Sequence, residues 1–191
     1  MAWVVFRFVS AQPTPLPVLR QVSAFSLTNQ LGEGVTHDRL QGQVWVANVI
    51  FSRCPTQCHV LSQQMAALQR LLQGQPLARL VSFTADPEVD TPSVLLSYGK
   101  RYGAESEHWW FLTGLKAELY RTAITDLGFT VVENSVPNPK FEDMFIHSNF
   151  FAVVDARGRL RAVVQGETPN AVRLLAEMVQ RLIKEKQDDV R

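Results

Sequence analysis

The sequence predicts a single α/β domain in which helices flank a central mixed β-sheet. Two apolar runs alternate with amphipathic helical patterns in the first half of the 191-residue chain. Strands that alternate with helices pair in parallel, because the helix carries the chain back across the sheet. Two further apolar runs near the C-terminus are separated by a short turn, which predicts an antiparallel hairpin. Together these patterns predict a mixed sheet.

The first strand is expected at residues 44–51, VWVANVIF. Its apolar residues form a nearly continuous run, which is typical of a central strand covered on both faces. From Pro55 onward, apolar residues recur at helical spacing and predict an amphipathic helix. These residues are Leu61, Met65, Leu68 and Leu72. A second strand is expected at residues 77–84, LARLVSFT.

Two more helices are expected before the C-terminal hairpin. Thr91-Pro92 predicts the start of the first, because threonine is a favourable N-cap and proline is favoured at the first helical position. Apolar residues at helical spacing predict the second at residues 115–127. Between these helices, Trp109 and Trp110 are expected in the core and at its rim rather than on an electron-transfer path.

The C-terminal hairpin is expected to have strands at residues 149–154 and 160–164. The turn DARG joins them, and Gly158 in this turn can supply a positive φ. A last amphipathic helix is expected from Thr168 to Ile183. This order of elements is the plan of a thioredoxin-like fold, a central mixed sheet flanked by helices, here with an N-terminal extension.

The domain is expected to occupy residues 22–185, between a stub or linker at residues 1–21 and a tail at residues 186–191. The apolar start MAWVVFRFV is too short to cross a bilayer. It is either the remnant of a membrane anchor or a frayed tail. The chain carries 19 basic and 18 acidic side chains. This balance argues against nucleic acid as a partner, since phosphate-binding proteins usually show a basic excess.

Both cysteines of the chain lie in one short motif, CPTQC, from Cys54 to Cys58. The motif directly follows the first strand, at the expected first turn of a helix. On a helix, side chains at i and i+4 have β-carbons about 5–6 Å apart, so both sulfurs could point at one ion. The positive end of the helix dipole favours thiolates, which select Cu(I), zinc or iron–sulfur clusters over hard ions.

A third ligand is needed, because two cysteines cannot close a tetrahedral site. His147 is the candidate, since in a thioredoxin-like plan the start of the first hairpin strand lies beside the N-terminus of the cysteine helix. His59 is expected to point away from Cys58, because adjacent helical residues do not share a face. His37 and His108 lie in polar stretches and are expected to be solvated. The alternative is that the cysteines are ordinary core residues, since cysteine is among the most buried types.

Three segments in this order resemble the Sco/SenC family of copper proteins, which are used in assembling cytochrome c oxidase. The segments are VANVIFSRCPTQC, SFTADPEVDTPSVLLSYGKRYG and IHSNFFAVVDARGRLRAVVQG. The resemblance covers about residues 22–183. It implies a thioredoxin-like fold and a copper site made by Cys54, Cys58 and His147. One departure is Ile146, where many members of the family have an aspartate.

The resemblance also implies what the protein does and where. It implies a metallochaperone that delivers copper, as Cu(I) or Cu(II), to the binuclear centre of a cytochrome c oxidase subunit, or that reduces the cysteines of this centre. Other copper chaperones and thioredoxin-like reductants are further expected partners. The expected location is the extracytoplasmic side of a bacterial cell envelope, with the full-length protein tethered to the membrane.

Several alternatives stay open at this point. The main one is a thiol–disulfide oxidoreductase that uses Cys54 and Cys58 as catalytic thiols without a metal. Covalent haem attachment is another, because CPTQCH differs by one residue from the usual Cys-x-x-Cys-His signature. A Cys₂His zinc site is a third. In the loop after the second strand, Asp90 or Thr91 is expected to cap the next helix, and a place for Asp86 and Asp90 near the copper is the alternative.

Overall fold

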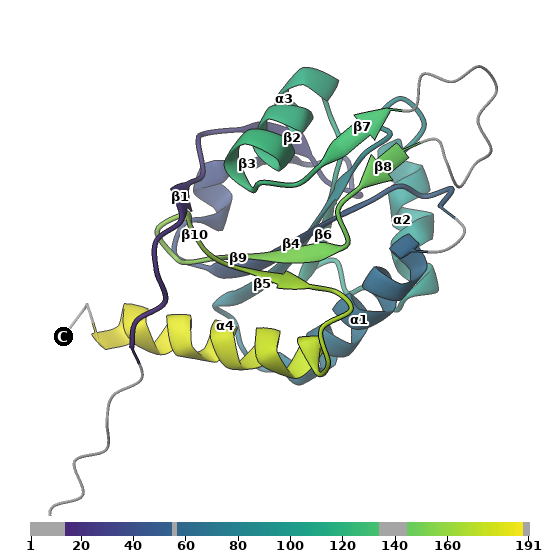
Figure 1. Cartoon of the computed structure of the whole chain (residues 1–191). Coiled ribbons are helices and arrows are strands. Elements are labelled where there is room, and N and C mark those ends of the chain that lie inside the picture. Colours follow the sequence, from purple (N-terminus) through teal and green to yellow (C-terminus); the bar gives the residue numbers. More distant parts are fainter. Residues whose placement is uncertain (1–13, 55–56, 134–144, 189–191) are drawn as a thin grey trace, which may run out of the picture.

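The computed structural model describes residues 14–54, 57–133 and 145–188. Its centre is a six-stranded mixed sheet with the strand order β1-β10-β9-β4-β5-β6 (Figure 1). The parallel strands are β4 (Val44–Ile50), β5 (Ala78–Thr84) and β6 (Trp109–Leu112). The antiparallel strands are β9 (Phe150–Val154), β10 (Arg159–Gln165) and β1 (Arg20–Gln21). The predicted α/β fold with a mixed sheet is confirmed.

Strand β4 is the buried centre of the sheet, as its continuous apolar run predicts. All seven of its residues are buried, between β5 on one side and β9 on the other. Its one polar side chain, Asn48, accepts a hydrogen bond from the hydroxyl of Ser82 at 2.6 Å. Ser82 in turn accepts one from the indole nitrogen of Trp109 at 2.9 Å. This chain of hydrogen bonds links three neighbouring strands and pairs the side-chain oxygen of Asn48, while its buried side-chain nitrogen has no hydrogen-bond partner among the described residues.

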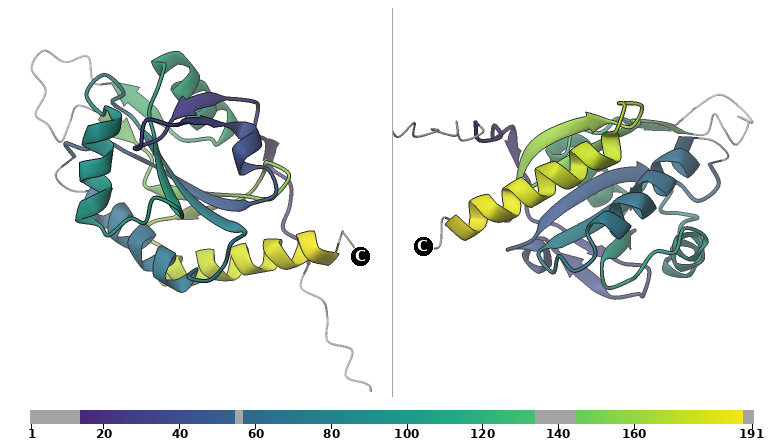
Figure 2. Two further views of the ribbon diagram at one scale, coloured as in Figure 1. Left: turned by 180° about the vertical axis from the view of Figure 1, so that it is seen from behind. Right: turned by 90° about the horizontal axis from the view of Figure 1, so that it is seen from below.

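Helices cover both faces of the sheet (Figures 1 and 2). On one face α1 (Gln57–Leu71) packs against α4 (Ala171–Asp188), and α2 (Pro92–Arg101) lies beside α1. The hydroxyls of Tyr98 and Ser62, 2.8 Å apart, join α2 to α1. The other face carries α3 (Lys116–Tyr120), the hairpin of β2 (Ser26–Thr28) and β3 (Gly34–Thr36), and a short 3₁₀ turn, His37–Leu40.

The helix expected at residues 115–127 is divided. Its first part is α3, and its second part is a wider π-helical turn, Arg121–Asp126. Within the helix the hydroxyl of Thr122 donates to the carbonyl oxygen of Glu118 at 3.1 Å. Such a bond competes with the backbone ladder and favours local distortion of a helix. Spacing of apolar residues alone does not distinguish these two helical forms.

The shortest strands are not predicted from the sequence. Besides β1, β2, β3 and β6, these are β7 (Val131–Glu133) and β8 (Phe145–His147), which pair with each other. Strands of two to four residues carry too little periodicity to be recognised without their partners. The hairpin turn follows the prediction, and Gly158 has a φ of +72°. None of the helices in the described ranges is long and apolar enough to span a membrane.

Gly166 permits a close approach of chain segments beside the start of α1. A β-carbon at this position would lie 2.6 Å from Cδ2 of Leu61 and 2.8 Å from the carbonyl oxygen of Asn149. We expect Gly166→Ala to lower the free energy of unfolding by about 1–3 kcal/mol, because the added methyl overpacks the contact. Urea titration followed by circular dichroism would measure this loss.

Gly34→Ala is the matched control, because a β-carbon at Gly34 would meet no atom within 4 Å. Its expected effect is within about 0.5 kcal/mol, as for most surface substitutions. Equal losses in the two variants would contradict the role given to close packing at Gly166.

Candidate metal centre

The two cysteines lie at the junction between β4 and α1. Cys54 lies in the loop that leaves β4, and its backbone N–H donates to the carbonyl oxygen of Phe51 at 3.1 Å. Cys58 lies in the first turn of α1. The prediction that both cysteines share one helical face is therefore wrong, because Cys54 precedes the helix. Pro55, where the sequence placed the helix start, is outside the described residues.

The two thiols are close but differ in environment. No disulfide joins them, and Cys54 is half-buried whereas Cys58 is fully buried. Burial raises the pKa of the Cys58 thiol, and a hydrogen bond with Cys54 raises it further. The expectation that the helix N-terminus favours a thiolate is therefore wrong for Cys58. Loss of solvation in the core outweighs the partial positive charge of the helix end.

A buried carboxylate anchors the loop that carries Cys54. Asp90 has no exposed surface and accepts a hydrogen bond from the backbone N–H of Ser52 at 3.1 Å. The hydroxyls of Ser52 and Thr84 also donate to it. Burial raises the pKa of Asp90, and the hydrogen bonds from Ser52 and Thr84 oppose this rise. Asp90 thus ties the loop after β4 to the end of β5.

A second contact between the same two loops is the ion pair of Arg53 and Asp86. Their side chains meet at 2.7 Å, next to Cys54 in the chain. The backbone N–H of Asp86 also donates to the hydroxyl of Thr84 at 2.9 Å. The segment DPEVDTP therefore supplies two carboxylates to the residues just before Cys54.

Thr91, rather than Asp90, caps α2. The hydroxyl of Thr91 accepts from the backbone N–H of Val94 at 3.5 Å, and Pro92 begins the helix. Of the two capping candidates in the sequence, the structure selects Thr91, because the Asp90 side chain turns inward to Ser52 and Thr84. The sequence does not predict that Ser52, Thr84 and Asp90 form one cluster. The only hint is the pair of aspartates in the loop after the second strand.

His147 lies at the same end of the sheet as the cysteine loop. It ends β8, where it pairs with Val131, and its side chain is outside the described part of the structure. The chain then enters β9, which runs antiparallel to β4. The start of β9 therefore lies beside the end of β4 (Figure 1), as the topological argument expects. Contact between His147 and the sulfurs remains a prediction.

The other three histidines contact residues away from the cysteine pair or lie half-buried elsewhere in the fold. The ring of His59 lies 3.0 Å from the hydroxyl of Tyr102 and 2.9 Å from the amide of Gln63, in line with the expectation that it points elsewhere. His37 was expected to be solvated, which is wrong, because its side chain is 11% exposed and packs edge-on against Phe25. His108 is half-buried rather than fully solvated.

Trp109 and Trp110 lie in the core and at its rim, as expected. Trp109 has no exposed surface, and Trp110 is 6% exposed at the rim. The guanidinium groups of Arg39 and Arg79 lie over the ring of Trp110, at 5.0 and 4.3 Å from its centre. Trp109 stacks on Phe111 with ring centres 4.8 Å apart. These contacts explain both residues as packing elements.

The described residues contain no group of three or more His, Cys, Asp or Glu side chains arranged to hold a metal ion. The side chain of His147 lies outside the described part of the structure. A hollow of about 180 Å³ lies next to the first turn of α1, lined in part by Gln57, Val60 and Asn149.

Sequence comparison identifies one family over most of the chain. The SCO1/SenC profile matches residues 15–184. The "SCO1 protein homolog" of Bacillus subtilis (strain 168) is 31% identical over 163 residues, which cover 83% of this chain and 82% of that protein.

Solved structures show the same fold. A SCO1/SenC family lipoprotein from Bacillus anthracis str. Ames superposes with a TM-score of 0.76 at 26% identity, over 90% of this chain and 99% of that chain. BsSco, a Sco-family cytochrome c oxidase assembly protein with a disulfide switch, gives 0.76 at 27% identity, over 91% and 99%. Copper-bound ScoI of Bradyrhizobium japonicum gives 0.72 at 20% identity, over 85% and 99%. The thioredoxin-like fold is confirmed.

The unequal exposure of the two cysteines predicts an order of alkylation. In the reduced protein, iodoacetamide should label Cys54 first, because Cys58 is fully buried and burial raises its pKa. Mass spectrometry of peptides after brief labelling at neutral pH would measure the ratio. Denatured protein, in which both thiols are exposed, is the control and should lose the preference. Faster labelling of Cys58 in the folded protein would contradict the assigned burial.

Proposed function

This chain is a member of the SCO1/SenC family, and from that premise we propose that it is a copper-binding metallochaperone for cytochrome c oxidase. Its copper is cargo, delivered to the binuclear copper centre of an oxidase subunit. The observation that carries the proposal is the contact between the Cys54 and Cys58 thiols at the junction of loop and helix. Two adjacent sulfur ligands suit copper, because soft thiolates favour Cu(I).

The proposed ligands are Cys54, Cys58 and His147. The half-exposed position of Cys54 supports transfer, since a cargo metal must be reachable by the receiving protein. The anchoring of Ser52 and Arg53 by Asp90 and Asp86 supports a loop held in one conformation before metal arrives. Preorganised ligands lower the entropy lost on binding. Copper-bound ScoI of Bradyrhizobium japonicum offers a precedent within the same fold.

The proposed location is the extracytoplasmic side of a bacterial cell envelope. A similar protein from Bacillus anthracis is a lipoprotein, which supports a membrane tether for this chain. We take residues 22–185 as the body of the domain. The linker at residues 1–21 adds the edge strand β1 at its end, and the tail at residues 186–191 begins within the last turn of α4. The proposed partners are the oxidase subunit that receives copper, other copper chaperones and thioredoxin-like reductants.

Thiol–disulfide exchange is the second candidate function, and the asymmetry of the cysteine pair favours it. The more exposed Cys54 would attack a disulfide of the partner and form a mixed disulfide, releasing one partner thiol. Cys58 would then displace the second partner thiol, leaving a Cys54–Cys58 disulfide and a partner reduced by two electrons. The disulfide switch of BsSco supports such chemistry in this fold. Both functions use the same reduced pair and can coexist.

Oxidation should abolish copper uptake, because metal ligation needs deprotonated thiols. We expect about one copper per chain in the reduced protein and none in the protein with a Cys54–Cys58 disulfide. Titration with copper under anaerobic conditions, followed by absorption and electron paramagnetic resonance spectra, would measure both. Equal uptake by the two forms would exclude the cysteine site, whereas partner reduction without copper uptake would favour the oxidoreductase.

His147→Ala should separate the two oxidation states of copper. Two thiolates can hold Cu(I) alone, whereas Cu(II) prefers a tetragonal site with nitrogen or oxygen donors. We therefore expect Cu(I) affinity to be largely kept. Cu(II) affinity should fall by more than the roughly 10–100-fold that is typical of losing an outer hydrogen-bonding partner. Competition with chelators specific for each oxidation state would measure the two affinities.

His59→Ala is the matched control, because His59 is next to Cys58 but its ring contacts Tyr102 and Gln63. Both copper affinities should stay near those of the wild type. Loss of Cu(II) binding in His59→Ala but not in His147→Ala would show that the wrong histidine has been assigned.

A further inference from the structure

Within the described ranges, β6 is an edge strand of the central sheet, with β5 on one side and no strand of the same sheet on the other. Its sequence WWFL is apolar, and all four residues are buried. The backbone N–H of Leu80 in β5 donates to the carbonyl oxygen of His108 at 2.8 Å. Backbone groups alternate in direction along a strand, so those of Trp110 also face β5, whereas those of Trp109 and Phe111 face away from it. An edge of this kind is a template for pairing with another chain.

The side chain of Gln30 occupies this edge of β6. Its amide nitrogen donates to the carbonyl oxygen of Trp109 at 2.8 Å, and its amide oxygen accepts from the backbone N–H of Phe111 at 2.9 Å. Gln30 is buried, so both bonds are shielded from water. The amide group therefore makes the two hydrogen bonds that one residue of a neighbouring parallel strand would make.

A side chain closes the edge because the chain turns away from β6 just before Gln30. Thr28 and Thr113 exchange backbone hydrogen bonds at 2.8 and 2.9 Å, so the end of β2 begins to pair with the residue that follows β6. Asn29 then folds the chain back, since its side-chain oxygen accepts from the backbone N–H of Leu31 at 2.9 Å. Gln30 is thus part of the turn between β2 and β3, and its side chain takes the place of a further strand.

The opposite edge of the sheet is closed by charged groups. Strand β1 pairs with Arg159 and Leu160 of β10. The next residue, Arg161, donates to the carbonyl oxygens of Leu16 and Pro17 at 3.1 Å and so holds the segment before β1.

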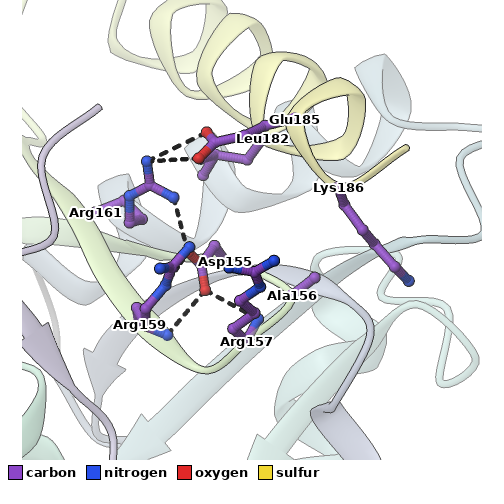
Figure 3. Close-up of a pocket in the computed structure, with 8 residues that line it drawn as sticks. All are labelled: Asp155, Ala156, Arg157, Arg159, Arg161, Leu182, Glu185 and Lys186. Atoms are coloured by element: carbon purple, nitrogen blue, oxygen red, sulfur yellow. Dashed lines mark hydrogen bonds and ion pairs between the residues drawn. The ribbon is translucent and has the colours of Figure 1, made fainter. Parts of the chain in front are cut away.

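An arginine cluster around Asp155 supports that edge (Figure 3). Asp155 follows the end of β9, which pairs with the start of β4. Its carboxylate accepts from the guanidinium groups of Arg159 and Arg161 at 2.8 Å, and Glu185 of α4 pairs with Arg161 at 3.0 Å. The two edges therefore differ, because the edge at β6 is closed by the neutral amide of Gln30.

The two backbone groups that Gln30 covers are those that two copies of β6 would exchange. In an antiparallel pair centred on Trp110 of both copies, the N–H of Phe111 in one copy faces the carbonyl oxygen of Trp109 in the other. Two-fold symmetry repeats the same contact. The edge of β6 is therefore complementary to itself, and the partner that fits it is a second copy of this chain.

We propose that Gln30 is a plug that keeps the chain monomeric by occupying the pairing edge of β6. Two copies pair through β6 only when the turn that carries Gln30 has moved away from this strand in both of them. Removal of the plug then joins two central sheets into one continuous sheet. The proposal does not rest on the copper function, because it uses only the contacts at the edge of β6.

Gln30→Ala in the full chain tests the plug, because it removes both hydrogen bonds. Loss of two neutral hydrogen bonds should shift the equilibrium between the closed and the open turn about 30-fold toward the open turn. Since both copies must open before they pair, the dimerisation constant should rise by about the square of this factor, roughly 1,000-fold. Sedimentation equilibrium over a wide range of protein concentrations would measure it, in a reducing buffer that excludes disulfide-linked dimers.

Gln69→Ala is the matched control. The buried amide of Gln69 also makes two hydrogen bonds to the backbone, with the carbonyl oxygen of Gly103 and the N–H of Glu105, both at 3.0 Å. These bonds end on the loop between α2 and β6 rather than on a strand edge. Gln69→Ala should therefore lose comparable stability and stay monomeric, like the wild type. Equal dimerisation of the two variants would overturn the proposal, because a general loss of stability would then explain it.

Hydrogen exchange at the backbone amide of Phe111 locates the interface. In dilute Gln30→Ala this amide should exchange about 30-fold faster than in the wild type, and its protection should return at concentrations where the variant dimerises. Gln30→Met removes the same polar groups but fills similar space, so it provides the same test if Gln30→Ala does not fold. A variant that stays monomeric at every concentration would overturn the plug. A dimer in which the Phe111 amide stays unprotected would overturn β6 as the interface.

Discussion

The buried carboxylate of Asp90 is the constraint on which the cysteine site depends. A polar group without exposure must find hydrogen-bond donors, because an unsatisfied one costs about 1–3 kcal/mol or more when charged. Asp90 finds them in Ser52 and Thr84, which come from the loop after β4 and from the end of β5. The need to satisfy one carboxylate thereby sets where the chain turns before Cys54. The Arg53–Asp86 ion pair reinforces this geometry from the solvent side.

The same burial that stabilises the site also sets its chemistry. Cys58 is in the core, where the neutral thiol is favoured, and Cys54 is at the surface of the same cluster. Metal binding, or attack on a partner disulfide, therefore requires Cys58 to lose its proton. The bond that forms must offset the free energy of this deprotonation. Cys58 is therefore held as the neutral thiol until a suitable soft ligand or oxidant arrives.

The rigid sheet joins two chemically distinct ends of the molecule. Strand β4 is buried throughout and is paired along much of its length, so its two ends keep a fixed separation. One end leads to the cysteines, and the other meets the arginine cluster around Asp155. In both places a buried aspartate accepts hydrogen bonds from neighbouring polar groups, but the pKa of the aspartate shifts in opposite directions. Burial raises the pKa of Asp90 despite its hydrogen bonds. Burial also raises the pKa of Asp155, but the combined hydrogen bonds from Arg161, Arg159 and Arg157 lower it more.

The sequence by itself determined the elements that carry local signals. The continuous apolar run of β4, the helical spacing in α1, the Thr91-Pro92 start of α2 and the DARG turn are all recognisable without partners, and so is the cysteine motif. Tertiary structure decided the rest. The short strands, the burial of His37, the inward turn of Asp90 and the raised pKa of Cys58 depend on residues distant in the chain. Strand pairing and desolvation are properties of the surroundings of a residue, and those surroundings exist only once the chain has folded.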